Sequence, residues 1–377
     1  MPDLGERELA YLQECITSSY VSSVGPFVGR FEKGLCAATG SDFAVSTSSG
    51  TSALHLALMA VGTRPGDLVV LPTYTFIASA NAIRHAGADP WLMDVSAESW
   101  TLDPNLLERC LSEDCARADG ALVHRVTGQR VAAIMPVYAV GHPADMDRIN
   151  EIAASFSLPV IADAAGAIGA RYRGRPLGLL ATVSALSFNG NKTITTGGGG
   201  AVLTNDAELA DRVRHVSSTA RRGAAYMHDA VAFNYRMTNV EAAVGCAQLE
   251  RLADFLTAKL ATDRYYRDTL ADLAWPFPSA EWAQSSHWLS GIVLPDAFPG
   301  RATWFATSMQ ATGVDARTFW IPMHLQQPYR DCLSTPMPVV EELWDRVVTL
   351  PSSSGISDKD KETVVLCARM LLQGTPG

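Results

Sequence analysis

Short apolar runs alternate with amphipathic stretches along the first two-thirds of the chain. The apolar runs predict strands at residues 43–47, 68–71, 91–94, 131–137, 158–163, 183–188 and 200–204. The amphipathic stretches predict helices at residues 52–61, 75–86, 145–156, 206–217 and 239–269. Strands that alternate with helices imply a mostly parallel sheet that helices cover on both faces.

The pattern changes near residue 290. An apolar segment at 291–295 is followed by a helix near 301–312, the segment RTFWIP at 317–322, and helices near 338–348 and 357–372. This second set of elements predicts a smaller α/β domain at the C-terminal end. We therefore expect a large domain over residues 1–250 and a small domain over residues 251–377.

Composition narrows the possible functions. The chain has 30 Lys and Arg against 39 Asp and Glu, a formal net charge of −9, and no long basic run. This balance argues against binding nucleic acid or an anionic membrane surface. No run of 18 apolar residues predicts a membrane span, and the N-terminus lacks a signal-peptide pattern. The seven scattered cysteines form no CxxC pair, so we expect no metal site and a cytoplasmic protein.

Small hydroxyl residues and a glycine gather at residues 47–52 (TSSGTS), where a predicted strand passes into a predicted helix. Free backbone N–H groups and the helix dipole make such a junction a good phosphate site. A simple helix cap explains the same residues, because Ser and Thr satisfy the first N–H groups of a helix. Both readings stay open on these residues alone.

Two ionisable residues follow predicted strands. Asp163 ends an apolar strand, the end at which open α/β sheets bind ligands, and suits either a protonated pyridine nitrogen or a helix cap. Lys192 lies between an apolar strand and the four glycines at 197–200. A Lys in such a tight, uncharged setting should have a lowered pKa and can form a Schiff base. A glycine-rich hairpin with a solvated Lys is the alternative.

Together these three features are consistent with a single cofactor-binding site. A phosphate site, an acid for a ring nitrogen and an imine-forming Lys are the protein groups that pyridoxal 5'-phosphate requires. The cofactor itself supplies the electron sink. The sequence therefore predicts a pyridoxal-phosphate enzyme.

The chain resembles the DegT/DnrJ/EryC1/StrS family of sugar aminotransferases over nearly its whole length. The matching motifs are VSSVGPFVGRFE (21–32), SSGTSALHLAL (48–58), PTYTFIASANAI (72–83), GHPADMDRI (141–149), DAAGAIGA (163–170), SFNGNKTITTGGGGAVLT (187–204), FNYRMTNVEAAVGCAQLERL (233–252) and IPMHLQQPYRD (321–331). So many motifs in one order are highly specific. The resemblance implies the type I aminotransferase fold, with a mostly parallel seven-stranded sheet in the large domain.

The resemblance also assigns roles to residues at the cofactor. Lys192 would bond to the cofactor and later move protons, and Asp163 would pair with the pyridinium. The phosphate would be held by Gly50, Thr51 and Ser187. The alternative for Ser187 is an ordinary hydroxyl at a strand end.

Two further cofactor positions follow from the resemblance. Phe76 would stack on the pyridine ring, and Asn234 would reach the phosphate of the neighbouring subunit, because the family's active sites lie at the interface of a homodimer. A core position for Phe76 and a helix cap for Asn234 are the alternatives. One position departs from the family: Gly166 stands where many members have Gln beside the cofactor's phenolic oxygen. We expect a water or another side chain to take over that contact.

Substrate positions are implied at four residues. His324 resembles a position near the sugar, and Tyr226, His228 and Arg236 lie in a region that resembles the inter-subunit substrate loop. An Arg or His there can pair with a diphosphate. Ordinary surface or interface residues are the alternative for all four.

The resemblance predicts transfer of an amino group from L-glutamate to a nucleotide-linked 4-keto-6-deoxy sugar, as in polysaccharide and lipopolysaccharide biosynthesis. It favours UDP-linked 4-keto-6-deoxy-N-acetylglucosamine as the acceptor. A GDP-perosamine synthase-like activity and a 3-ketosugar aminotransferase are alternatives. A sugar dehydratase of the same family would have His in place of Lys192. A non-catalytic binding protein would not need the intact set of Lys192, Asp163 and phosphate site.

Overall fold

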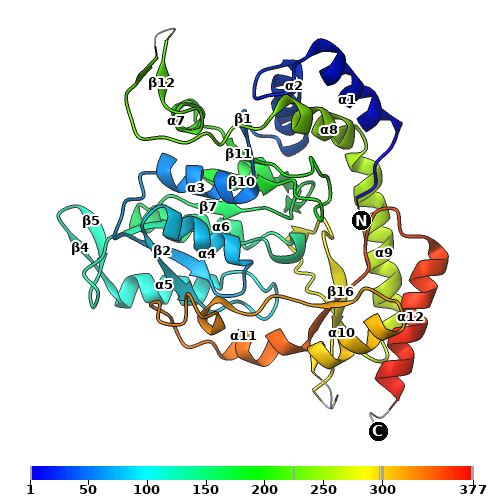
Figure 1. Ribbon diagram of the computed structural model, residues 1–377. Helices are drawn as coiled ribbons and strands as arrows, with labels where there is room; N and C mark the ends of the chain where they lie inside the picture. The colour runs from blue at the N-terminus through cyan, green and yellow to red at the C-terminus, as the bar shows by residue number, and fades with distance from the viewer. Residues whose placement is uncertain (1, 224–225, 297, 299–300, 375–377) are drawn as a thin grey trace.

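The computed structural model describes residues 2–223, 226–296, 298 and 301–374. A seven-stranded sheet lies at its centre (Figure 1). Four strands pair in the order β1-β11-β10-β7 and three in the order β3-β2-β6. Parallel bridges from Ile134 to Val160 and from Val137 to Asp163 join the two groups. The strands are β1 (Phe43–Thr47), β2 (Leu68–Pro72), β3 (Asp89–Met93), β6 (Val131–Ile134), β7 (Ile161–Asp163), β10 (Val183–Ser187) and β11 (Gly200–Thr204).

Only one strand of this sheet is reversed. β11 runs antiparallel to β1 and β10, and the other pairs are parallel. The prediction of a mostly parallel seven-stranded sheet is therefore confirmed. The carboxyl ends of β1, β7 and β10 meet along one edge, which is where such sheets bind ligands.

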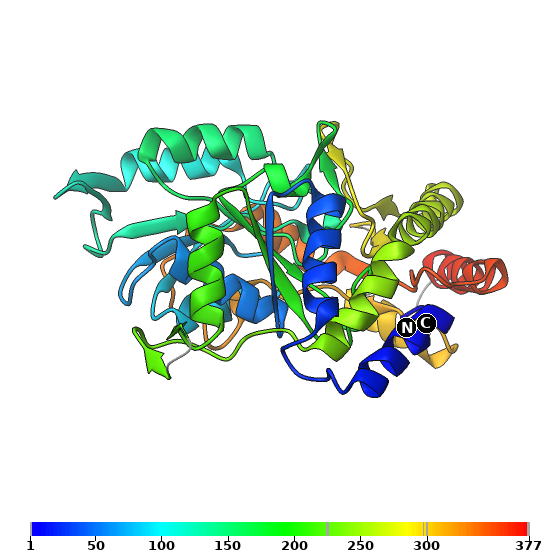
Figure 2. The same cartoon turned by 90° about the horizontal axis from the view of Figure 1, so that it is seen from above.

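Helices cover both faces of the sheet because its strands are apolar on both faces. In β2, Leu68 and Val70 join one core cluster, whereas Val69 and Leu71 join another. Successive side chains of a strand point to opposite faces, so both clusters need a cover. Seen from above, α2 and α7 flank β1 on opposite sides (Figure 2). The helices of this region are α1 (Glu6–Ser18), α2 (Pro26–Thr39), α3 (Gly50–Ala60), α4 (Ile77–His85), α5 (Pro104–Glu113), α6 (Met146–Phe156), α7 (Ala207–Ser217) and α8 (Asn239–Glu250).

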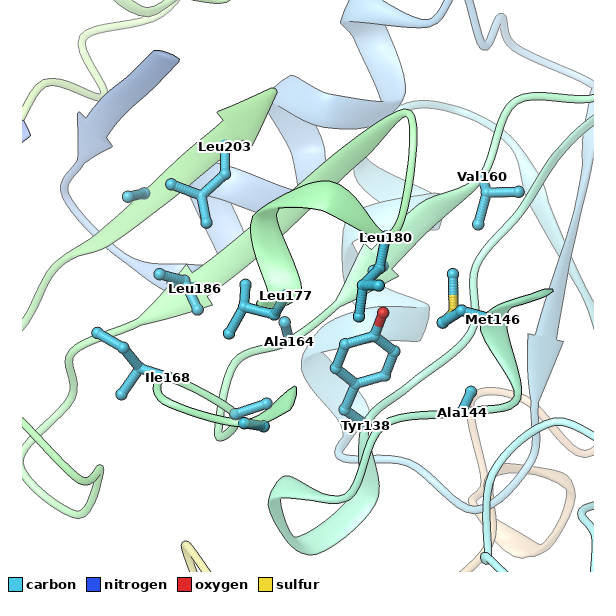
Figure 3. Packing of buried hydrophobic residues seen from close by; sticks show 14 of the residues in the cluster. Tyr138, Ala144, Met146, Val160, Ala164, Ile168, Leu177, Leu180, Leu186 and Leu203 are labelled. Atoms are coloured by element: carbon cyan, nitrogen blue, oxygen red, sulfur yellow. The ribbon is translucent and has the colours of Figure 1, made fainter. Parts of the chain in front are cut away.

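One core cluster supports the segment that follows β7. Figure 3 shows Ala164 and Ile168 beside Leu177 and Leu186, with the ring of Tyr138 close by. All five side chains are buried. Because interiors are close-packed, this cluster fixes the backbone that carries Asp163.

The C-terminal part has its own antiparallel sheet, in the order β14-β16-β18-β17. Helices α9, α10 and α12 pack on it with a separate cluster of buried side chains. Its elements are α9 (Leu252–Leu270), β14 (Trp275–Pro276), β16 (Ser290–Val293), α10 (Ala302–Ala311), β17 (Arg317–Thr318), α11 (Pro338–Leu343), β18 (Val347–Leu350) and α12 (Asp358–Gln373).

Two helix predictions need correction. The predicted helix 239–269 is two helices, α8 and α9, which meet at Arg251, where φ is −107° and ψ is 5°. The predicted helix 338–348 ends at Leu343 and continues as a short 3-10 turn before β18 begins at Val347. β18 is buried between β16 and β17, so backbone pairing on both sides overrides the local helical pattern. The domain boundary at 250 stays a prediction.

The sequence pattern gives no prediction for several elements that the structure contains. Helices α1 and α2 precede the first strand, and α5 follows β3. The short strands are β4 (Cys115–Ala118), β5 (Ala121–His124), β8 (Arg171–Tyr172), β9 (Arg175–Pro176), β12 (Arg221–Arg222), β13 (Met227–His228) and β15 (Ala283–Gln284). Among the described residues, no helix combines the length and apolar character needed to cross a membrane.

Candidate active site

A cavity of about 680 Å³ opens at the carboxyl edge of the central sheet. Its lining includes Gly50 after β1, Asp163 at the end of β7 and Ser187 at the end of β10. Lys192 lines it from the following loop, and Trp320 lines it from the C-terminal part. This volume lies within the usual range for small-molecule and cofactor sites.

Asp163 is held in one orientation at the floor of the cavity. Its Oδ2 accepts a hydrogen bond from Ser79 Oγ at 2.6 Å, and its Oδ1 accepts one from the Ala165 N–H at 3.1 Å. The residue is only 5% exposed, and burial raises the pKa of its carboxyl group, whereas the bonds from Ser79 and Ala165 lower it. A buried carboxylate of this kind favours a cationic partner, such as a protonated ring nitrogen.

Lys192 lies on a loop that the backbone closes. The Thr196 N–H donates to the Phe188 carbonyl at 3.0 Å, and the Lys192 N–H donates to the Asn189 carbonyl at 2.9 Å. Burial lowers the pKa of the Lys192 amine from 10.5 to about 8, and the Asp163 carboxylate opposes this shift. A neutral amine is the nucleophilic form, so this setting favours covalent chemistry at Nζ.

The junction of β1 and α3 is a helix cap that also lines the cavity. Ser49 is the N-cap, and its Oγ accepts from the Ser52 N–H at 3.0 Å. Gly50 and Thr51 begin the helix, where N–H groups have no intrahelical acceptor, and both line the cavity. A Cβ on Gly50 would lie 2.7 Å from the Cβ of Ser187, so glycine lets the end of β10 approach the helix. The result is a site suited to a phosphate.

Aromatic side chains form one wall of the cavity. Phe76 lines it and is 55% exposed, which excludes a core position. The Phe76 and Trp320 ring centroids lie 6.4 Å apart, and those of Trp320 and Trp288 lie 6.1 Å apart. The sequence analysis missed Trp288, Trp320 and Ser79, since nothing in their local pattern indicates a site.

Trp288 explains the departure at position 166. A Cβ built on Gly166 would lie 2.4 Å from Cε3 and 2.7 Å from Cδ2 of the indole. The indole thus occupies the space that a side chain at position 166 would need. This space is therefore filled by an aromatic side chain from a distant part of the chain, and the expected contact to the cofactor's phenolic oxygen stays a prediction.

The predicted substrate residues do not join this group. His324 shares a hydrogen bond of 2.8 Å between Nδ1 and Thr73 Oγ1, and its Nε2 lies 3.4 Å from Glu341 Oε1. Burial lowers the pKa of His324, while Glu341 opposes the shift. His324 is not among the described residues that line the cavity.

The residues predicted in the region from β12 to Arg236 do not line the cavity either, although Arg236 pairs with Thr47 and the Ser48 N–H donates to the Tyr235 carbonyl at 2.8 Å, just before the start of α3. The hairpin of β12 and β13 projects from the body of the chain (Figure 1). Tyr226 is 85% exposed beneath the Arg221 guanidinium, and His228 Nδ1 donates a hydrogen bond of 2.7 Å to the Thr219 carbonyl. Asn234 and Arg236 are exposed. Among the described residues, none of these lines the cavity, so their roles stay predictions.

The residues present fit pyridoxal phosphate. An oriented carboxylate, an amine of lowered pKa, an aromatic face and a helix N-terminus share one cavity. Of the described residues, no group of three His, Cys, Asp or Glu side chains could hold a metal ion.

The chain is also similar to known proteins. Residues 2–369 match the model of the DegT/DnrJ/EryC1/StrS aminotransferase family. The GDP-perosamine synthase of Caulobacter vibrioides is 35% identical over 378 residues, which cover 98% of this chain and 97% of that protein. The GDP-perosamine synthase of Escherichia coli O157:H7 is 34% identical over 370 residues, which cover 97% and 95%.

A solved structure gives the same result. DesV of S. venezuelae, in complex with a ketimine intermediate, has a TM-score of 0.87 and 30% identity, and the match covers 98% of this chain and 95% of DesV. The chain has the type I aminotransferase fold, and its cofactor is pyridoxal phosphate. The chain belongs to the DegT/DnrJ/EryC1/StrS aminotransferase family.

Proposed function

We propose that the chain transfers an amino group from L-glutamate to the keto group of a nucleotide-linked 4-keto-6-deoxy sugar. The observation that supports this proposal is that Lys192 and Asp163 share one cavity with the N-terminus of α3. We place the reaction in the cytoplasmic synthesis of a bacterial surface glycan. It would run as two half-reactions, the first with the amino donor and the second with the keto sugar.

Each residue has a defined part in this proposal. Pyridoxal phosphate, when bound, supplies the electron sink that stabilises charge at the α-carbon of the amino donor. Gly50, Thr51 and Ser187 would hold its phosphate, and Phe76 would cover its ring. Asp163 would keep its ring nitrogen protonated.

Lys192 has two roles in the proposed reaction. Its amine would hold the cofactor in the resting state and then carry a proton to and from the substrate carbon. An amine with a pKa of about 8 exchanges protons readily near neutral pH, because general acid–base groups work best near the operating pH. Burial of the amine in the cavity wall is what creates this value.

The nucleotide is the finer part of the proposal. The relatives named GDP-perosamine synthase support a GDP-linked acceptor first. The motif around Lys192 resembles enzymes that use UDP-linked 4-keto-6-deoxy-N-acetylglucosamine, which we place second. A 3-ketosugar acceptor is third.

We further propose that a second copy of the chain completes the site: its Asn234 would reach the cofactor phosphate, and its Tyr226, His228 and Arg236 would contact the sugar nucleotide. These four residues are exposed and do not line the cavity of their own chain, as residues that serve a neighbour would. α1 supports this arrangement, because Leu9 and Ile16 expose most of their side chains on its surface. Two copies related by a two-fold axis would bury both surfaces.

A two-stage assay tests the function. The purified protein is loaded with pyridoxal phosphate and mixed with L-glutamate, and its absorbance spectrum is recorded before and after. It is then incubated with GDP-linked and UDP-linked 4-keto-6-deoxy sugars and with a 3-keto sugar, and the masses of the products are measured by mass spectrometry. We expect an amino sugar from a 4-keto substrate. Amination of the 3-keto sugar alone, or loss of a hydroxyl without gain of nitrogen, would contradict the proposal.

A further inference from the structure

Trp288 touches three parts of the active site at once. Its indole fills the space above Gly166, where a Cβ would lie 2.4 Å from Cε3. The same ring lies below Lys192, whose Nζ is 3.5 Å from the ring centroid. Its Nε1 donates a hydrogen bond of 2.7 Å to the Asn191 carbonyl, next to Lys192 in the chain.

The indole is itself fixed from behind. Trp288 is 5% exposed. The buried Lys259 on α9 donates from Nζ to the Trp288 carbonyl at 3.0 Å and to the Ser352 carbonyl at 2.9 Å. Both the backbone and the ring of Trp288 are thus anchored, so the ring can serve as a rigid support for its neighbour.

The face of the indole ring is the side that can attract the Lys192 amine when it is charged. An ammonium over the face of an indole is attracted by the ring quadrupole, and the attraction grows when water is excluded. The charged groups that act on Lys192 are few: Asp163 on β7 raises the pKa of its amine, and burial lowers it. An aromatic face therefore offsets part of the burial effect without adding a second carboxylate.

We propose that Trp288 is the positioning residue of Lys192: its ring face holds the amine at the cavity wall, and its bulk takes the place of a side chain at position 166. Gly166 and Trp288 then form an interlocking pair, in which the absence of one side chain admits the other. This inference rests on the proposed role of Lys192 as the cofactor's lysine.

The test measures the Lys192 amine directly in the cofactor-free protein. Trace labelling with acetic anhydride across a pH series, read by mass spectrometry of the peptide with Lys192, gives the pKa of the amine. Trp288→Leu keeps apolar bulk and removes the ring face, so the pKa should fall by about one unit. Trp288→Phe keeps a weaker face and should give a smaller fall. Trp275→Leu removes an indole that lies under Arg346 elsewhere, and should leave the pKa unchanged.

The direction of the shift separates positioning from packing. If Trp288 only filled space, its loss would admit water and the pKa of Lys192 would rise toward its ordinary 10.5. A rise, or no change in a folded Trp288→Leu protein, overturns the proposal. The measurement needs neither cofactor nor sugar, so a wrong substrate assignment would not affect it.

A second test addresses the interlock. Gly166→Ala places a methyl group against the rigid indole and should lower the melting temperature of the protein. It should also lower the maximum extent of acetic anhydride labelling that Lys192 reaches at high pH. Combining Gly166→Ala with Trp288→Leu should recover the melting temperature above that of Gly166→Ala alone, because the clashing atoms are gone. Additive losses in the double variant would overturn the interlock.

Discussion

The cavity at the sheet edge and the projecting β12–β13 region differ in how completely one chain builds them. At the cavity, Asp163 and Lys192 are fixed by hydrogen bonds and packing within the same chain. In the projecting region, Tyr226 and His228 face outward with few contacts. The two residues proposed to act at the cofactor ring are thus positioned within a single chain. The phosphate contact of Asn234 and the sugar half, as proposed, are completed by a second chain.

The largest expected effect is at Lys192. Lys192→Ala should reduce turnover by roughly 10⁴-fold or more, since a positioned proton-transfer group alone contributes up to about that factor. The protein should still fold and retain cofactor weakly. Product formation from the keto sugar measures this, with the exposed Lys33→Ala as the matched control. Near-normal turnover in Lys192→Ala would contradict the assignment of Lys192 as the lysine that bonds to the cofactor.

Asp163 should give the next largest effect. Asp163→Asn keeps an acceptor for Ser79 but removes the charge that would pair with the ring nitrogen. A hydrogen bond to a charged group contributes about 1.5–3 kcal/mol, so cofactor affinity should fall by roughly 10- to 100-fold. Equilibrium titration with pyridoxal phosphate measures the change. Unchanged affinity and unchanged rates of both half-reactions would argue that Asp163 is only structural.

Mixing two inactive chains sharpens the comparison between the regions. If Lys192 and Asn234 of one site come from different chains, Lys192→Ala mixed with Asn234→Ala forms dimers in which one site is intact. Random pairing should then restore about a quarter of the wild-type activity. Each variant alone should have low activity. No recovery after subunit exchange would place both residues in the same site of one chain.

The smallest expected effect is a pH shift at Ser79. The Ser79 hydroxyl lowers the pKa of Asp163, so Ser79→Ala should raise it further above its usual range. With a raised pKa, Asp163 becomes protonated and loses its charge at a higher pH as the solution is acidified. The pH below which cofactor affinity declines should therefore be higher in Ser79→Ala than in the wild type. A binding titration at several pH values shows this. Ser18→Ala, at an exposed position on α1, is the control, and an unchanged pH dependence would mean that Ser79 does not tune the acid.

Local patterns explain why much of the fold was predictable. Apolar runs of four to six residues in the central sheet are buried on both faces, so the runs at 68–71 and 183–188 mark β2 and β10 closely. Glycine and hydroxyl residues mark the start of α3 for the same local reason. The helix predicted at 338–348 fails at its end because β18 gains two strand neighbours that lie far away in the sequence.

The sequence by itself determined the strands of the central sheet and the family, because apolar runs and motifs depend on residues close together in the chain. It also predicted Lys192, Asp163 and the turn at residues 47–52 as the residues that hold the cofactor. The tertiary structure decided what lies against them. Only the fold brings Trp288 over Gly166 and under Lys192, and only the fold places His324 against Thr73. Periodicity and motif spacing record short-range order, whereas these contacts arise from the packing of distant segments.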